Sequence, residues 1–212
     1  MQKLLSRASF LRLAATSLLI LPSVAFADDN EISKDDILHD PEAPTAGNPD
    51  GDLTIVDFFD YNCPFCKKAA VNLERFVKTD GKIRLVYKDW PILGPTSIIG
   101  ARIALAAKYQ GKYLDVHHAL MNIPGEGIPQ ERMIEEVRKT GVDMTRLDAD
   151  INGHAEEIGE LIKRNLAIGA AIGFLGTPGF LIGPFRVNQA LTYDGFVHAV
   201  ADARARQKKQ PG

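Results

Sequence analysis

The sequence has little cysteine and no excess charge of either sign. Only two of its 212 residues are cysteine and only one is tryptophan. A single cysteine pair excludes a small domain held together by several disulfides. The 25 basic and 27 acidic residues give a net charge of −2, so nothing in the charge suggests nucleic acid as a partner. Hydrophobic residues make up 45% of the chain, as in an ordinary globular protein.

Long apolar runs are also missing, apart from one near the N-terminus. Leu13–Val24 is mostly apolar but too short to span a membrane comfortably. Basic residues precede it, and Ala25-Phe26-Ala27 follows it as a small-x-small cleavage site. The sequence therefore predicts a signal peptide over residues 1–27, cleaved after Ala27, and export to the periplasm. The alternative is an uncleaved N-terminal anchor, which would also place the domain outside the cytoplasm.

The remainder of the chain divides by composition into two parts. Residues 28–50 are polar and contain three prolines, which favours an N-terminal arm or linker with one short helical turn around Ser33–Leu38. Residues 51–212 have the periodic apolar patterns of a folded domain.

The two cysteines stand two residues apart, in the motif Cys63-Pro64-Phe65-Cys66. The apolar run Leu53–Phe59 before it predicts a buried strand, and the helical spacing of apolar residues after it predicts a helix. Cys63 is thus expected at the first turn of a helix, where backbone N–H groups and the helix dipole favour an anion. A thiol at this position is biased toward the thiolate, which is the reactive form.

Two other interpretations of the cysteine pair remain. One is a structural pair, although a bridge across two intervening residues constrains little of the unfolded chain. The other is half of a zinc site, which needs further ligands. The chain has no second cysteine pair and its five histidines are scattered. Two of them, His117 and His118, are interpreted as helix-surface or core-edge residues and not as ligands.

The order of the elements after the motif predicts an α/β fold. Lys82–Lys88 alternates like a strand, so strand, helix and strand form a βαβ unit with parallel strands. Residues 96–173 are mostly helical and form an insertion. Two short strands, Phe180–Ile182 and Phe185–Val187, and a final helix over Tyr193–Arg206 return the chain to the sheet.

These features together resemble the DsbA-like exported thiol–disulfide oxidoreductases of the thioredoxin superfamily. The resemblance covers about residues 37–205 and depends on the joint pattern of the cysteine motif, the helical insertion and Gly176–Phe180 before the next strand. The flanks Asp57–Asn62 and Tyr87–Leu93 are similar to the ScsC-like bacterial branch. The resemblance implies a thioredoxin fold with an inserted all-helical subdomain.

The resemblance implies a role for four residues in catalysis. Cys63 matches the exposed nucleophilic cysteine and Cys66 the buried resolving cysteine. Asp57 matches a buried acid that exchanges a proton with the resolving thiol. Lys88 matches a position that pairs with this acid. The alternatives are a carboxylate of Asp57 that faces water at the end of a strand and a solvated Lys88.

Four further residues are expected at the substrate site. Thr177 and Pro178 resemble the cis-proline loop of the family, whose backbone pairs with an extended substrate strand beside Cys63. The alternative is an ordinary trans proline in a turn. Pro64 and Phe65 lie between the cysteines and tune the direction of exchange. The DsbA pattern has histidine in place of Phe65 and valine in place of Thr177, which favours a pair less oxidising than DsbA.

The expected function is an exported disulfide oxidoreductase that forms, reduces or reshuffles disulfides in other proteins. It would use no cofactor and no metal, and it would act as a monomer. Its partners would be exported cysteine-containing proteins and a redox partner that resets the pair. The alternative is a module that binds a soft metal such as Cu(I) through its thiolates, or acts like a chaperone, with little exchange activity.

Overall fold

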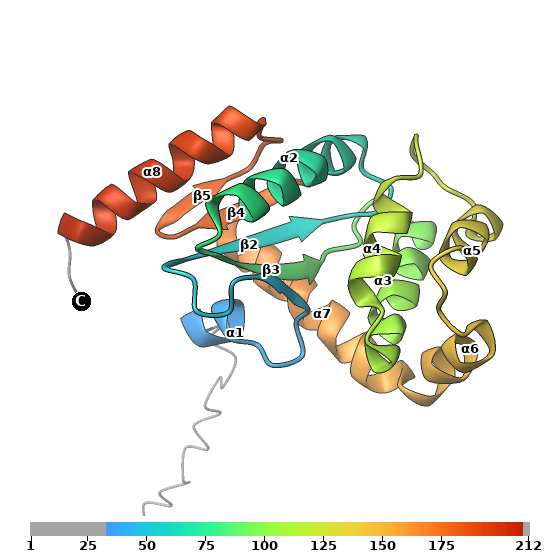
Figure 1. Ribbon diagram of the computed structural model, residues 1–212. Helices are drawn as coiled ribbons and strands as arrows, with labels where there is room; N and C mark the ends of the chain where they lie inside the picture. The colour runs from blue at the N-terminus through green and yellow to red at the C-terminus, as the bar shows by residue number, and fades with distance from the viewer. Residues whose placement is uncertain (1–32, 210–212) are drawn as a thin grey trace, which may run out of the picture. The chain divides into compact units, whose positions relative to one another are not determined.

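A five-stranded mixed sheet runs through residues 33–209, the part of the chain that the computed structural model describes (Figure 1). The predicted signal peptide lies outside these residues. The central strands β2 and β3 are parallel, and the other neighbours are antiparallel. Across the sheet the order is β1 (Thr45–Gly47), β3 (Ile83–Asp89), β2 (Leu53–Phe59), β4 (Gly179–Ile182) and β5 (Phe185–Val187).

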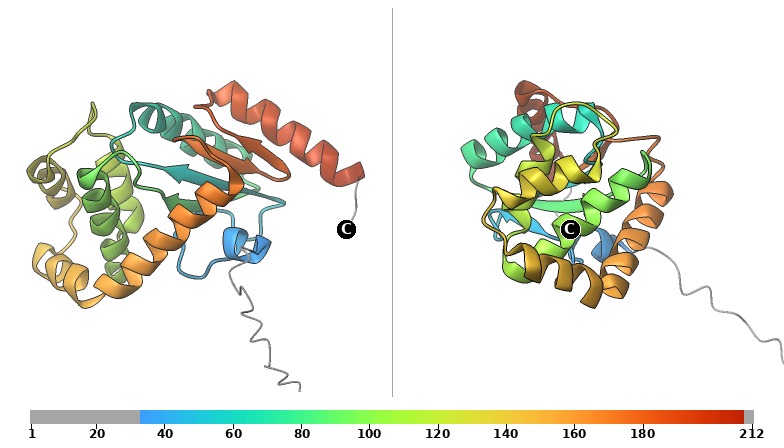
Figure 2. Two further views of the ribbon diagram at one scale, coloured as in Figure 1. Left: turned by 180° about the vertical axis from the view of Figure 1, so that it is seen from behind. Right: turned by 90° about the vertical axis from the view of Figure 1, so that its right-hand side faces the viewer.

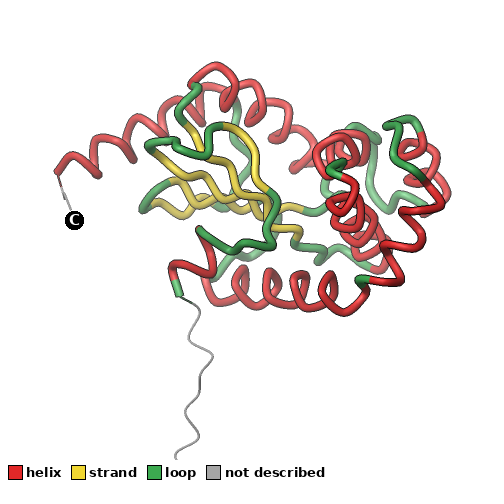
Figure 3. The backbone as a smooth tube through the Cα atoms, turned by 60° about the horizontal axis from the view of Figure 1, so that its bottom comes forward, coloured by secondary structure: helices red, strands yellow, loops and turns green. Residues whose placement is uncertain are grey.

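Helices cover both faces of the sheet (Figure 3). Helices α2 (Pro64–Asp80) and α8 (Tyr193–Lys209) lie on one face, and α1 (Lys34–Leu38) and α7 (Ala155–Ile172) lie on the other. The core divides in the same way, because successive side chains of a strand point to opposite faces. Ile55 and Phe59 of β2 pack with the α2 side, whereas Val56 and Phe58 pack with the α7 side.

The helical insertion lies at one end of the sheet (Figure 2). It confirms the expected α/β class, a thioredoxin fold with an inserted helical subdomain. The insertion comprises α3 (Pro95–Ala107), the 3-10 turn η1 (Lys108–Gln110), α4 (Tyr113–Met121), α5 (Gln130–Arg138) and α6 (Met144–Gly153), and it leads into α7.

The described part of the N-terminal arm belongs to the fold and is not a free linker. β1 pairs with β3 along the edge of the sheet, and Asp40 is buried. The sequence did not predict β1, because three residues ending in glycine are too few to show the alternation of a strand. The helical turn expected around Ser33–Leu38 is confirmed as α1, with Ser33 as its N-cap.

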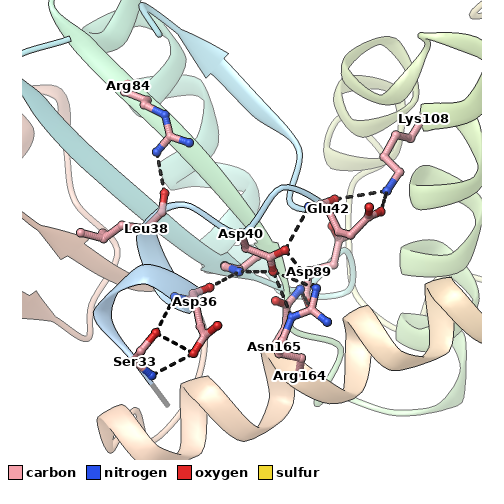
Figure 4. A network of polar contacts seen from close by, with 11 residues as sticks. Ser33, Asp36, Leu38, Asp40, Glu42, Arg84, Asp89, Lys108, Arg164 and Asn165 are labelled. Atoms are coloured by element: carbon pink, nitrogen blue, oxygen red, sulfur yellow. Dashed lines mark hydrogen bonds and ion pairs between the residues drawn. The ribbon is translucent and has the colours of Figure 1, made fainter. Parts of the chain in front are cut away.

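A buried ion-pair cluster fastens this segment to the sheet and to α7 (Figure 4). Nζ of Lys88 lies 2.9 Å from Oδ2 of Asp40 and donates to the backbone oxygen of Asp36 at 3.2 Å. Arg164 of α7 donates to both carboxylate oxygens of Asp40, at 3.0–3.1 Å. Burial by itself would raise the pKa of Asp40, but the hydrogen bond and charge of Lys88, with hydrogen bonds from the Glu42 N–H and Arg164, together lower it.

The substitution Asp40→Ala is expected to lower the free energy of unfolding by about 3–5 kcal/mol, because it leaves the Lys88 ammonium buried without its partner. Glu42→Ala is the matched control. Glu42 lies two residues after Asp40 and makes an exposed ion pair with Lys108. The control is expected to cost less than about 1 kcal/mol. Urea unfolding of the three proteins measures both changes, and equal losses would contradict the cluster's role.

Candidate active site

The reactive sulfur lies at the N-terminus of α2. Cys63 is the N-cap residue, and its Sγ accepts a hydrogen bond from the backbone N–H of Cys66 at 3.2 Å. Pro64 follows at the first helical position, which it suits because it has no N–H to leave unpaired. Both cysteines are free thiols. The strand-to-helix geometry that the sequence predicted is therefore present.

The two thiols differ strongly in acidity. A hydrogen bond from the Cys66 thiol is the largest cause that lowers the pKa of Cys63 to about 6; the backbone N–H groups of Cys66 and Phe65 help, against burial. Burial, and then the neighbouring Cys63, raise the pKa of Cys66 well above its usual range. Near neutral pH the pair thus holds a thiolate at Cys63 and a proton at Cys66, which suits a nucleophile and a resolving thiol.

Cys63 is less open than the resemblance implied. It is only 3% exposed, against 2% for Cys66. The reason is the loop before β4, because Sγ of Cys63 lies 3.4 Å from the backbone oxygen of Thr177. A substrate that reaches the sulfur therefore also contacts this loop.

The Thr177–Pro178 peptide bond is cis, as the resemblance implied. The side chain of Asn188, just after β5, holds the loop in place. Its Nδ2 donates to the backbone oxygens of Gly176 and Pro178 at 2.7 and 3.2 Å, and its Oδ1 accepts from the N–H of Leu175 at 2.7 Å. The sequence did not reveal Asn188, since a lone asparagine after a strand carries no distinctive pattern.

Apolar side chains stand exposed beside this loop and the cysteine motif. Leu175 is 96% exposed and Phe65 is 59% exposed. Single exposed apolar residues are common, but these two flank the residues that contact the reactive sulfur. They offer an approaching peptide exposed apolar side chains on both segments that contact the reactive sulfur.

Asp57 lies on the side of the sheet that faces α2 and is 3% exposed. Among residues 33–209, its Oδ1 has no hydrogen-bond partner. Burial, then the charges of Cys63, Asp89 and Glu74, raise the pKa of Asp57 well above its usual range. The carboxyl is therefore not a strand-end group facing water, and it holds a proton more readily than an exposed aspartate.

The expected pairing of Lys88 with Asp57 is wrong. In the parallel β2–β3 register Asp57 lies opposite Tyr87, whereas Lys88 lies opposite Phe58. Since neighbours in sequence point to opposite faces, Lys88 extends to the α7 side and binds Asp40 instead. Lys88 is fully buried, so it is not a solvated lysine either.

Two polar residues before Cys63, which the sequence reasoning missed, hold the active-site turn. Oδ1 of Asp60 accepts the N–H of Asn62 at 2.8 Å, and its Oδ2 accepts from Ile92 and Leu93 at 2.8 and 3.0 Å. The Asn62 side chain accepts from the N–H of Ile128 at 2.7 Å and donates to two hydroxyls at the start of α3. These bonds tie the turn to the helical insertion.

The two adjacent histidines have different environments. His117 is buried and its Nδ1 lies 3.1 Å from the Tyr61 hydroxyl. Burial, then the charge of His118, lower the pKa of His117 to about 3, so it is neutral at physiological pH. His118 lies at the surface, with its Nε2 3.2 Å from Glu74. Across residues 33–209, no three histidine, cysteine or acidic side chains gather as a metal site.

A thiolate at a helix N-terminus, a protonated second thiol and a cis-proline loop define a dithiol redox site. A family model described as Thioredoxin matches residues 39–202, and the chain belongs to this family. The predicted likeness to DsbA-like thiol–disulfide oxidoreductases is confirmed by solved structures.

Three solved structures illustrate the likeness. A thioredoxin-like oxidoreductase from Silicibacter pomeroyi is 39% identical, with a TM-score of 0.77 over 82% of this chain and 99% of that one. The thiol–disulfide exchange protein alpha-DsbA2 from Wolbachia pipientis is 30% identical, with a TM-score of 0.74 over 79% of this chain and 90% of that one. The catalytic domain of Proteus mirabilis ScsC shares the fold. It is 23% identical, with a TM-score of 0.71 over 81% of this chain and 94% of that one.

Curated relatives include much longer proteins. The Na(+)/H(+) antiporter NhaA of Herminiimonas arsenicoxydans is 30% identical over 177 residues, which are 79% of this chain and 26% of the antiporter. NhaA 1 of Mycobacterium sp. strain KMS is 26% identical over 147 residues, 68% of this chain and 24% of that protein. The chain thus spans about a quarter of the curated relatives it matches.

The Cys63 thiolate is expected to titrate with a pKa of about 6 in the reduced protein. In Cys66→Ala the midpoint should rise by about one pH unit, because the strongest hydrogen bond to the sulfur is lost. The ultraviolet absorbance of the thiolate against pH measures both values. A midpoint near the usual 8.5 in the parent protein would contradict the geometry.

Proposed function

We propose that this protein is an exported disulfide oxidoreductase that acts on cysteine-containing proteins through Cys63 and Cys66. The observation that carries the proposal is the asymmetry of the pair, with a stabilised thiolate at Cys63 and a protonated thiol at Cys66. The cis-proline loop beside the sulfur supports the substrate roles proposed for Thr177 and Pro178.

The oxidising reaction begins with a substrate thiolate that attacks Sγ of Cys63 in the Cys63–Cys66 disulfide. Cys66 leaves and takes a proton, which Asp57 supplies from its buried carboxyl. A second substrate thiolate then attacks the substrate sulfur of the mixed disulfide and expels Cys63 as a thiolate. Two substrate thiols become one disulfide, and the protein pair gains two electrons.

In the reducing or isomerising direction the thiolate of Cys63 attacks a substrate disulfide. Cys66 then gives its proton to ionised Asp57 and displaces the substrate by attacking Cys63. The side chain of Phe65 between the cysteines supplies no polar group to the thiolate. Together with Thr177 before the cis-proline, this favours a general oxidoreductase over a dedicated oxidase.

Export to the periplasm is part of this proposal. The predicted signal peptide supports it, as does the likeness to a periplasmic thioredoxin-like protein from Salmonella enterica serovar Typhimurium, 28% identical with a TM-score of 0.73 over 82% of this chain and 99% of that one. Within residues 33–209, no helix is long and apolar enough to cross a membrane. We propose a monomer whose cysteine pair is reset by a separate redox partner.

The parent protein is expected to catalyse the reduction of insulin by dithiothreitol, and Cys63→Ala should abolish this activity because the nucleophile is lost. Cys66→Ala should retain attack but accumulate mixed disulfides that non-reducing electrophoresis detects. Glu42→Ala, in an exposed ion pair, serves as the folded control. Stoichiometric Cu(I) binding by a parent protein without exchange activity would instead favour the metal-binding alternative.

A further inference from the structure

A cavity of about 600 Å³ opens beside α2, on the face of the sheet that holds Asp57. Glu74, Lys78, Tyr87 and His118 are among its lining residues, which come from α2, β3 and α4. Tyr87 is the lining residue that lies opposite Asp57 in the β2–β3 register. The cavity therefore ends against the immediate neighbour of the buried acid.

Asp57 needs a route by which protons enter and leave. Its carboxyl is almost completely buried, and Oδ1 has no hydrogen-bond partner among the described residues. In the reduced protein the charge of Cys63 adds to burial and raises the pKa of Asp57. In the mixed disulfide that charge is gone, so Asp57 must lose its proton before it can accept one from Cys66.

Tyr87 lines the cavity and is the cross-strand neighbour of Asp57. Burial, then the charges of Asp57 and Glu74, raise the pKa of Tyr87, so its hydroxyl stays protonated and lies within the field of both carboxyls. A neutral hydroxyl both donates and accepts a hydrogen bond, and it can therefore pass a proton between a carboxyl and water.

We propose that this cavity is the proton-exchange port of Asp57, with the Tyr87 hydroxyl at its inner end and the Glu74–His118 pair at its mouth. The inference rests on the proposed role of Asp57 in the thiol–disulfide reaction. Glu74 and His118 act as positioning residues, because they set the electrostatic potential along the route and do not touch the reacting sulfurs.

Several charged or titratable groups bear on Asp57 from the elements packed against it. Within the described residues, the charges that raise the pKa of Asp57 are those of Cys63 and Glu74 on α2 and Asp89 on β3. The other titratable groups near the cavity are Lys78 on α2, Tyr87 on β3, and His118 with its neighbour Asp115 on α4. Of these, Glu74 combines an effect on the Asp57 pKa with a place at the cavity and partial exposure, with its ion pair to His118 at 3.2 Å. An exposed pair of this kind contributes little to stability, so its charge can be changed without unfolding the protein.

The test follows the step in which Cys66 attacks Cys63. Reduced protein is mixed with glutathione disulfide, quenched with acid at successive times and analysed by mass spectrometry, which separates the Cys63–glutathione mixed disulfide from the internal disulfide. The rate of conversion is measured across pH for the parent and for Glu74→Gln, Tyr87→Phe, Asp57→Asn and Lys78→Gln.

Glu74→Gln should move the midpoint of the pH profile down by about half a pH unit. The negative charge of Glu74 raises the pKa of Asp57, and the substitution removes that charge, so the pKa falls. Tyr87→Phe should slow the conversion several-fold at every pH. Lys78→Gln is the control, because Lys78 lines the same cavity but is not among the groups that shift the pKa of Asp57. It should leave the pH profile unchanged.

Profiles of Glu74→Gln and Tyr87→Phe that match the parent, together with a changed profile in Asp57→Asn, would overturn the port and leave the role of Asp57 intact. An unchanged profile in Asp57→Asn would overturn the role of Asp57 and the port with it. If Tyr87→Phe fails to fold, as thermal unfolding would show, the half-exposed Glu74→Gln still decides the question.

Discussion

The chemistry depends on one interaction, the hydrogen bonding of the Cys63 sulfur by the first turn of α2. The backbone N–H of Cys66 reaches this sulfur because β2 ends a few residues earlier and the helix begins at once with Pro64. Asp60 and Asn62 fix the intervening turn by binding backbone N–H groups from segments far along the chain. The helical insertion thus contributes to the site by holding the turn, although it provides neither cysteine.

The two faces of the sheet separate two charged systems. On the α2 side, none of the charges within residues 33–209 that shift the pKa of Asp57 is a cation, so burial keeps this pKa high and lets Asp57 hold a proton for Cys66. On the α7 side, the charge of Lys88 is paired with that of Asp40, and this ion pair holds the N-terminal segment to the domain. A shift of one residue in the register would exchange the faces and place the ammonium beside the acid. The register of β2 and β3 therefore keeps Lys88 away from Asp57 and leaves the pKa of Asp57 high.

Much of the fold could be predicted from the sequence, because its long elements have clear periods and ends. The expected bounds of β2, β3, β4 and β5 agree with the structure to within one residue. What the sequence could not supply were partners: Asn188 and Asn62 act through residues distant in the chain, and β1 is too short to show a pattern. The same limitation explains Lys88, since its position in the motif was identified but the face on which its side chain lies was not.

The measurement that tests the account most directly is the reduction potential of the Cys63–Cys66 pair against glutathione. A thiolate with a pKa of about 6 is stabilised more than that of thioredoxin and less than that of DsbA. The account therefore predicts a potential between the two, at about −180 to −230 mV. A value near −120 mV would contradict it by showing a dedicated oxidase, and a pair that does not equilibrate with glutathione would contradict the redox function itself.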